Sequence, residues 1–171
     1  MILPLPKQFD ANEIFIIIST VLSWALMFKL PRHLSAVTIT IIWTFNVFLA
    51  LMADITISVK PNDFYFTIDH TTHELFDVLL HFATYPTLSY FVVNFYQHYK
   101  TKGVKLLYYI IFWAGAATAL EWISVKFHVF TYMGWKLYLS FLVYLVVFVA
   151  NIWLSNFIVN QNHGDGSAGL P

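Results

Sequence analysis

Residues 35–58 read SAVTITIIWTFNVFLALMADITIS and contain a single charged side chain, Asp54. A helix needs about 20 largely apolar residues to cross the hydrocarbon core of a bilayer, and this stretch is long enough. Irregular structure leaves backbone polar groups unpaired in lipid, which is too costly, so the stretch should be helical. The sequence therefore predicts a membrane-spanning α-helix here.

Four further stretches, separated by proline, glycine and charged residues, support the same prediction: 12–30, 69–97, 104–125 and 136–160. The first begins with Asp10 and Glu13 at the spacing of a capping box, and Pro86 should kink the helix over 69–97. We predict one all-α domain over residues 1–160, a polytopic transmembrane helical bundle of about five spans. The glycine-rich residues 161–171 resemble a linker or tag remnant, and we expect them to be disordered.

The composition favours a protein of the cell membrane. Of the 171 residues, 59% are hydrophobic and 11% charged, whereas soluble domains average about 25% charged residues. Membrane lipids are therefore the expected partners, and a homo-oligomer or a second membrane protein stays open. The net charge of zero gives no reason to expect nucleic-acid binding. The absence of cysteine excludes disulfides and thiolate metal sites.

The basic residues predict an orientation. With five spans, the first loop, the third loop and the C-terminus share one side, which carries five basic residues: Lys29, Arg32, Lys100, Lys102 and Lys105. The opposite side carries four: Lys7, Lys60, Lys126 and Lys136. Cytoplasmic loops are enriched in lysine and arginine, so we expect the N-terminus outside and the C-terminus in the cytoplasm.

The densest group of ionisable side chains lies in DHTTHELFDVLLH, residues 69–81. At about 100° per residue, five of them share an arc of roughly 100° on a helix: His70, His73, Glu74, Asp77 and His81. Antiparallel neighbours bring Asp54 and Glu121 toward the same leaflet. Ionisable groups in a membrane usually face the bundle interior or a cavity. We predict a site that binds or conducts a small ligand or ion, formed by Asp54, His73, Glu74, Asp77, His81 and Glu121.

Three interpretations of these residues stay open, and the cofactor, if there is one, is not specified. His73, Asp77 and His81 could bind a divalent metal such as zinc in a membrane-embedded enzyme, with Glu74 or Glu121 as acid and base. The histidines and carboxylates could instead relay protons or ions. In the third interpretation they form a structural network that fixes helix register, as in an assembly subunit of a membrane complex.

Other polar and aromatic residues have structural interpretations. Asn46, Asn94 and Asn151 are predicted to form interhelical hydrogen bonds, and the small residues 115–119 to allow close helix packing. Four aromatic residues near the last loop look like an interfacial belt: Trp122, Tyr132, Trp135 and Tyr138.

Short motifs in the second half of the chain resemble a known family. They are Phe66-Thr67 leading into a helix, Tyr85-Pro86, Leu120-Glu121-Trp122 and Tyr132-x-x-Trp135-x-x-Tyr138-x-Ser140. The family comprises small multi-pass membrane proteins of Bacillus and Clostridium relatives, and the similarity covers 12–160 loosely and 64–155 better. Pro86, Glu121 and Trp135 match its recurring positions, whereas the histidine-rich stripe does not. The resemblance implies a bacterial inner-membrane helical bundle, with no assigned activity and no catalytic residues to carry over.

Overall fold

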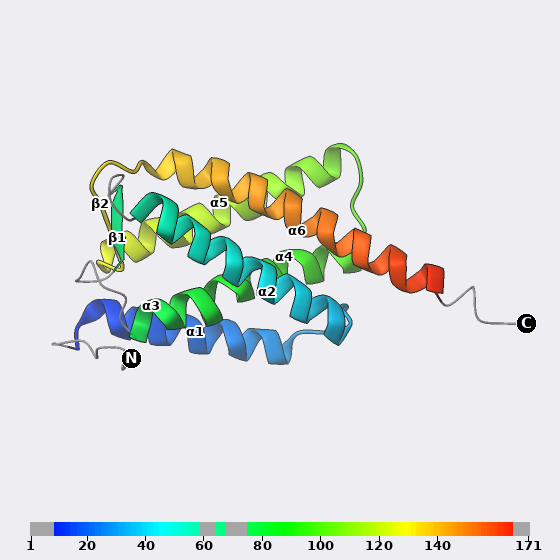
Figure 1. Ribbon diagram of the computed structural model, residues 1–171, viewed down its shortest axis with the longest axis horizontal. Helices are drawn as coiled ribbons and strands as arrows, with labels where there is room; N and C mark the ends of the chain where they lie inside the picture. The colour runs from blue at the N-terminus through cyan, green and yellow to red at the C-terminus, as the bar shows by residue number, and fades with distance from the viewer. Residues whose placement is uncertain (1–8, 59–63, 68–74, 166–171) are drawn as a thin grey trace, which may run out of the picture.

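The computed structural model describes residues 9–58, 64–67 and 75–165 as an all-α bundle, which confirms the predicted fold class. The helices run along the long axis of the molecule (Figure 1). Their bounds are α1 (Ala11–Lys29), α2 (Ala36–Ala53), α3 (Leu75–Leu79), α4 (Tyr85–Tyr99), α5 (Val104–Lys126) and α6 (Leu137–Asp165). Two π-helical segments, η1 (Asp54–Ser58) and η2 (Leu80–Thr84), extend α2 and join α3 to α4.

The helix boundaries follow the local signals closely at most ends. The predicted capping box is present, with the Asp10 amide donating to Glu13 Oε2 at 2.9 Å and the Asn12 amide to Asp10 Oδ1 at 3.1 Å. The expected disordered tail from residue 161 is wrong at its start, because α6 continues to Asp165. Each residue added to an existing helix gains a backbone hydrogen bond without a new nucleation cost.

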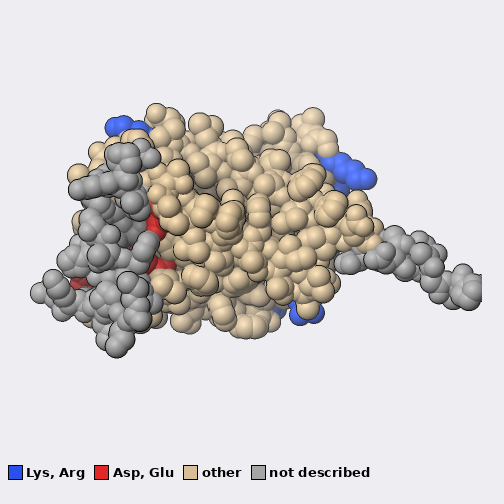
Figure 2. Space-filling model, in the orientation of Figure 1, with Lys and Arg blue, Asp and Glu red and all other residues tan. Residues whose placement is uncertain are grey.

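The outer surface of the bundle is that of an integral membrane protein. Four helical segments are long and apolar enough to cross a bilayer: Ala11–Lys29, Ala36–Ile57, Val104–Lys126 and Leu137–Gln161. Large apolar side chains such as Phe28, Phe112 and Val146 are exposed on them. The middle of the face drawn in Figure 2 shows no charged side chain, and those visible lie toward the two ends. Hydrocarbon is the solvent that suits such a surface.

The remaining helix, over residues 75–99, lies inside the bundle. Ten of the fifteen residues of α4 are buried, against three in α2 and three in α5. Helices α1, α2 and α6 pack against it, and Tyr109 of α5 donates a hydrogen bond to the Val92 carbonyl at 2.6 Å. The least apolar of the five predicted spans is therefore enclosed by the other four, which keeps its polar side chains away from lipid.

The π-helical segment η2 ends at Thr84, two residues before Pro86, where the sequence predicts a disturbed helix. Proline has no amide hydrogen, so the Phe82 carbonyl four residues earlier loses its helical donor. The Trp43 indole of α2 donates to that carbonyl at 2.9 Å, and the Trp24 indole of α1 donates to the Ala83 carbonyl at 3.3 Å. Neighbouring helices thus satisfy the interrupted turn, as the membrane interior requires.

A short antiparallel ribbon that the sequence did not predict caps one end of the bundle. It pairs β1 (Tyr65–Thr67) with β2 (Phe130–Tyr132), and Tyr65 lies opposite Tyr132. The Phe64 carbonyl accepts the amides of residues 133, 134 and 135 at 2.9, 3.0 and 3.0 Å. The ribbon therefore holds the residues around Tyr65, Tyr132 and Trp135 at the end of the bundle where α5 ends and α6 begins.

Candidate functional site

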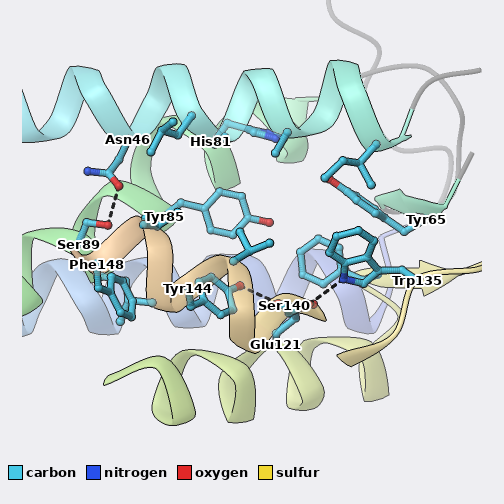
Figure 3. A pocket seen from close by; sticks show the side chains of 18 of the residues that line it. Asn46, Tyr65, His81, Tyr85, Ser89, Glu121, Trp135, Ser140, Tyr144 and Phe148 are labelled. Atoms are coloured by element: carbon cyan, nitrogen blue, oxygen red, sulfur yellow. Dashed lines mark hydrogen bonds between the residues drawn. The ribbon is translucent and has the colours of Figure 1, made fainter. Parts of the chain in front are cut away.

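A cavity of about 180 Å³ lies between α2, α4, α5, α6 and the ribbon (Figure 3). Its polar lining residues are Asn46, Tyr65, His81, Tyr85, Ser89, Glu121, Tyr132, Trp135, Ser140 and Tyr144. Its apolar lining residues are Leu49, Ala50, Ala53, Ile57, Leu88, Phe130, Val143, Val147 and Phe148. An apolar cavity of about 150 Å³ accommodates benzene, so this space suits a molecule of roughly six non-hydrogen atoms.

The carboxylate of Glu121, near the end of α5, is the acceptor of three hydroxyl groups. Its Oε1 accepts hydrogen bonds from Tyr132 and from Ser140, the latter at 2.6 Å, and its Oε2 accepts from Tyr144 at 2.7 Å. The Trp135 indole donates to Ser140 Oγ at 2.8 Å. An indole N–H can only donate, so the Ser140 hydroxyl keeps its own hydrogen for Glu121. The carboxylate accepts in all three bonds, which is the role of its ionised form.

No lysine or arginine of the described chain forms an ion pair with Glu121. Lys126 and Lys136, the basic residues closest to it in sequence, are exposed, and the Lys126 ammonium lies 5.5 Å from the ring centroid of Trp122. A charge removed from bulk water is costly unless another group compensates it. The three hydroxyl donors compensate Glu121 in part, and the cavity beside it leaves room for a further donor or cation.

Asp54 and His81 form a buried pair in which each member belongs to a π-helical segment. His81 Nε2 lies 3.4 Å from Asp54 Oδ2, and His81 Nδ1 lies 2.6 Å from the Asp77 carbonyl oxygen. A carbonyl can only accept, so Nδ1 carries a hydrogen. The contact of Nε2 with Asp54 is then attractive only with a proton between them, as imidazolium with carboxylate or imidazole with carboxylic acid. An attractive contact between these two atoms therefore requires one proton on the pair.

The two tyrosines of the ribbon are hydrogen-bond donors to Asp54, which is buried, and to Glu121, which is partly buried. Tyr65 donates to Asp54 Oδ1 at 3.1 Å, as Tyr132 does to Glu121. Burial, and then the charge of Asp54, raises the pKa of the Tyr65 phenol well above its usual 10.0. Burial, and then the hydrogen bond to Glu121, raises the pKa of Tyr132. Both phenols therefore stay protonated, and keep donating, throughout the physiological pH range.

Tyr85 extends across the cavity from the start of α4. Figure 3 shows its hydroxyl in the open space between His81 and Glu121. Its ring packs edge to face against His81, with 5.5 Å between the ring centroids. Within residues 9–58, 64–67 and 75–165, its hydroxyl has no recorded hydrogen-bond partner. A polar group directed into a cavity in this way is available to a bound molecule.

The inner end of the cavity is closed by a saturated amide pair. Asn46 and Asn151 exchange hydrogen bonds at 2.6 and 3.1 Å, and the Ser89 hydroxyl donates to Asn46 Oδ1 at 2.7 Å. Asn94 bonds the Pro31 carbonyl at 2.9 Å and the amide of residue 33 at 2.8 Å. The prediction that these asparagines hold helices together is therefore confirmed, with Asn94 attached to the loop after α1.

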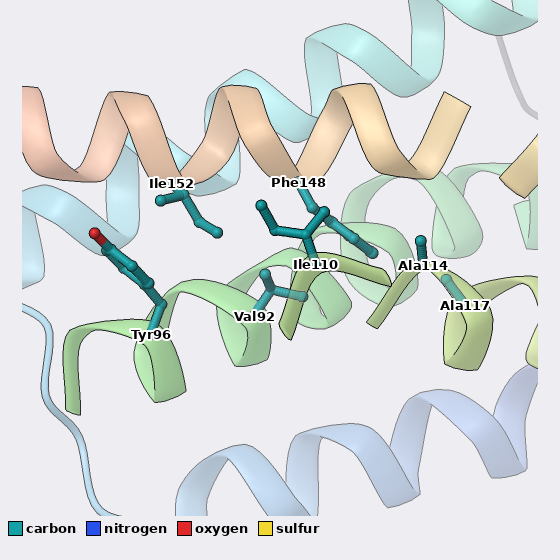
Figure 4. Packing of buried hydrophobic residues seen from close by; sticks show 7 residues of the cluster. All are labelled: Val92, Tyr96, Ile110, Ala114, Ala117, Phe148 and Ile152. Atoms are coloured by element: carbon teal, nitrogen blue, oxygen red, sulfur yellow. The ribbon is translucent and has the colours of Figure 1, made fainter. Parts of the chain in front are cut away.

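An apolar cluster fills the bundle beyond this amide pair (Figure 4). It consists of Val92, Tyr96, Ile110, Ala114, Ala117, Phe148 and Ile152. Ala114 and Ala117 are fully buried and allow the close approach of α5 to α6 that the small-residue patch predicts. A Cβ atom on Gly115 would meet no neighbour, so the contact does not depend on that glycine. The cluster separates the cavity from the opposite end of the bundle.

The structure brings together part of the predicted site. Asp54 contacts His81, and His81 lines the same cavity as Glu121. Asp77 is buried and contributes its carbonyl to His81, but it does not line the cavity. His73 and Glu74 lie outside the described residues. In the described part of the chain, no three histidine or carboxylate side chains are grouped to hold a metal, so nothing there supports the predicted metal site.

Sequence reasoning missed most of the groups that surround Glu121. These are Tyr65, Tyr85, Tyr132, Trp135, Ser140 and Tyr144. The interfacial-belt prediction is wrong for Tyr132 and Trp135, which turn inward to the network of Glu121. It agrees with the exposure of Trp122 and Tyr138. The available signal was a stripe of polar residues at helical spacing on the otherwise apolar α6: Ser140, Tyr144, Asn151 and Ser155.

No protein-family model, curated protein or solved structure matches this chain. The resemblance to the Bacillus and Clostridium membrane family stays a prediction.

Proposed function

We propose that this integral membrane protein binds a small ligand in the cavity, with Glu121 as the anchoring group. The observation that carries the proposal is a carboxylate that accepts three hydroxyl hydrogen bonds, lines an open space and has no recorded side-chain counter-ion in the described chain. Ionisable groups at membrane depth are expensive and are kept where they serve a site. A ligand that brings a positive charge or a hydrogen-bond donor would complete the coordination of Glu121.

Binding is better supported than conduction of ions through the bundle. Polar contacts do continue past the cavity, where Gln97 donates to Ser155 at 2.6 Å. The apolar cluster of Figure 4 lies along the same interface, and Phe148 forms part of both the cavity wall and that cluster. A conducted ion would have to pass this packed hydrocarbon, at a large cost in desolvation. We therefore favour a binding site that is open toward one end only.

We further propose that the N-terminus lies outside and the C-terminus in the cytoplasm. The loops after α1 and α4, with the adjoining helix ends, carry Lys29, Arg32, Lys100, Lys102 and Lys105. The other end carries Lys126 and Lys136, and the sequence adds Lys7 before α1 and Lys60 after η1, which makes four basic residues against five. The positive-inside rule favours the first end as cytoplasmic. The cavity would then lie in the outer half of the membrane.

The proposal is tested by thermal unfolding of the detergent-solubilised protein with four probes: tetramethylammonium chloride, zinc chloride, sodium acetate and methanol. Ala50→Phe fills the cavity, and Ala119→Phe makes the same change at an exposed position of α5. At least one probe should raise the Tm of the wild type and of Ala119→Phe, but not that of Ala50→Phe, because binding stabilises the folded state. If no probe does so, or if Ala50→Phe responds like the wild type, the proposal fails.

A further inference from the structure

The charges around the cavity select a cation. The described residues that line the cavity include no lysine or arginine. The attractive contact of His81 with Asp54 requires one proton on the pair, and with that proton the two side chains together carry no net charge. Among the described lining residues, Glu121 is then the one charged group without a recorded partner of opposite charge. A concave site of low dielectric with one sign of charge concentrates the opposite sign, which here is positive.

The walls select an organic cation over a metal ion. Aromatic rings line the space on several sides, from the ribbon, from α4 and from α6: Tyr65, Tyr85, Phe130, Trp135, Tyr144 and Phe148. Tyr65 stands edge to face with both Trp135 and Phe130, with 6.2 Å between centroids in each case. Aromatic faces attract alkylated ammonium ions, whose charge is spread over methyl groups. A zinc ion needs three or four nitrogen, oxygen or sulfur ligands, and the described residues supply no such group.

The size of the cavity limits which organic cations could bind. A space of about 180 Å³ suits roughly six non-hydrogen atoms, which matches an ammonium nitrogen with small alkyl substituents. The lining also includes apolar side chains such as Ala50 and Val147, which suit methyl or ethyl groups better than hydroxyl groups. A long polar substituent would meet the saturated amides of Asn46 and Asn151, whose hydrogen atoms are already used.

We propose that the ligand of the cavity is a small alkylated ammonium ion, with its charge against the Glu121 carboxylate and its alkyl groups against Tyr85, Trp135 and the other rings. This inference rests on the proposed function, because it names the chemical class of the ligand for the same site. The hydroxyl of Tyr85, which has no recorded partner in the described chain, lies beside the space where the ammonium group binds.

The test is equilibrium binding of radiolabelled tetramethylammonium to the purified full chain, at constant ionic strength set with sodium chloride. The wild type and Ala119→Phe should bind one equivalent saturably. Glu121→Gln should weaken binding at least tenfold, because it removes the charge and keeps the shape. Tyr85→Leu should weaken binding by about 3- to 30-fold, the range of one cation–π contact, and Tyr85→Phe by less. Tyr85 donates no recorded hydrogen bond to Glu121, so the two Tyr85 variants leave the hydrogen bonds of that carboxylate intact.

The outcomes separate this inference from the proposed function. Unchanged affinity in Glu121→Gln, or equal loss in Tyr85→Leu and Tyr85→Phe, would overturn the ammonium assignment. If tetramethylammonium does not bind while acetate, methanol or zinc stabilises the wild type but not Ala50→Phe, the cavity is a binding site for another class. If none of the four probes distinguishes Ala50→Phe from the wild type, both proposals fall.

Discussion

Asn46 on α2 and Asn151 on α6 exchange two side-chain hydrogen bonds, with N···O distances of 2.6 and 3.1 Å. Each uses its other amide hydrogen on the carbonyl four residues earlier in its own helix. Both amides are therefore saturated at full burial, which ties the two helices together in one register.

This pair should contribute to stability as a unit. Asn46→Leu and Asn151→Leu are each expected to lower the free energy of unfolding, measured in mixed micelles. The loss of unfolding free energy in the double mutant should be smaller than the sum of the two single losses by about 0.6 to 1.7 kcal/mol, the range of interhelical hydrogen bonds in membranes. Thr40→Val is the control, since that exposed hydroxyl bonds only within α2, and it should change stability by less than about 0.5 kcal/mol. Strict additivity of the two asparagine changes would contradict the account.

The Glu121 carboxylate should stabilise the fold as a hydrogen-bond acceptor, in addition to supplying the negative charge for ligand binding. Glu121→Leu leaves the hydroxyls of Tyr132, Ser140 and Tyr144 without their acceptor, at about 1–3 kcal/mol for each group that stays dry. We expect it to lower the free energy of unfolding by more than about 2 kcal/mol. Glu121→Gln keeps one carbonyl oxygen and should lose less than half as much. Equal losses in unfolding experiments would show that the hydroxyls do not depend on this carboxylate.

The tautomer of His81 is a direct consequence of its contact with the Asp77 carbonyl. In ¹⁵N NMR of histidine-labelled protein at neutral pH, Nδ1 of His81 should carry a proton. The chain has seven histidines, so a difference spectrum against His81→Gln identifies the signal. A signal in which Nδ1 is unprotonated and Nε2 alone is protonated would contradict the hydrogen bond to the Asp77 carbonyl and the zero net charge of the pair with Asp54.

The orientation can be measured cleanly because the chain contains no cysteine. Lys102→Cys places a thiol in the loop between α4 and α5, and Met133→Cys places one after β2, where the native side chain is 65% exposed. In intact bacterial cells, a membrane-impermeant maleimide should label Met133→Cys at once and Lys102→Cys only after permeabilisation. The reverse pattern would place the cavity in the cytoplasmic half of the membrane.

The helices could be predicted because their signals are local. The length and apolar composition of each segment, the capping box at Asp10 and the position of Pro86 can all be read from one stretch of chain, and the observed boundaries agree with them at most ends. The order of helices around a bundle depends on contacts between distant segments. The sequence could therefore bring Asp54, His81 and Glu121 to one leaflet, but it could not place His81 and Glu121 on the wall of one cavity.

The inward orientation of the aromatic residues in and beside the ribbon could not be predicted from the sequence either. A tyrosine or tryptophan near the end of a span is satisfied equally well by headgroups or by a buried acceptor. Tyr132 turns inward because Glu121 lies beside it, and Trp135 does so because Ser140 can relay its hydrogen bond. Both partners are fixed by the packing of α5 against α6, which no local pattern encodes.

The most direct test uses tetramethylarsonium, an isostere of tetramethylammonium whose arsenic atom scatters X-rays anomalously. Crystals grown with saturating tetramethylarsonium should show one arsenic peak in the cavity, beside Glu121 and within about 6 Å of an aromatic ring centroid. The peak should disappear in Glu121→Gln crystals grown in the same way. An empty cavity in the wild type, or an unchanged peak in Glu121→Gln, would contradict the assignment of this site.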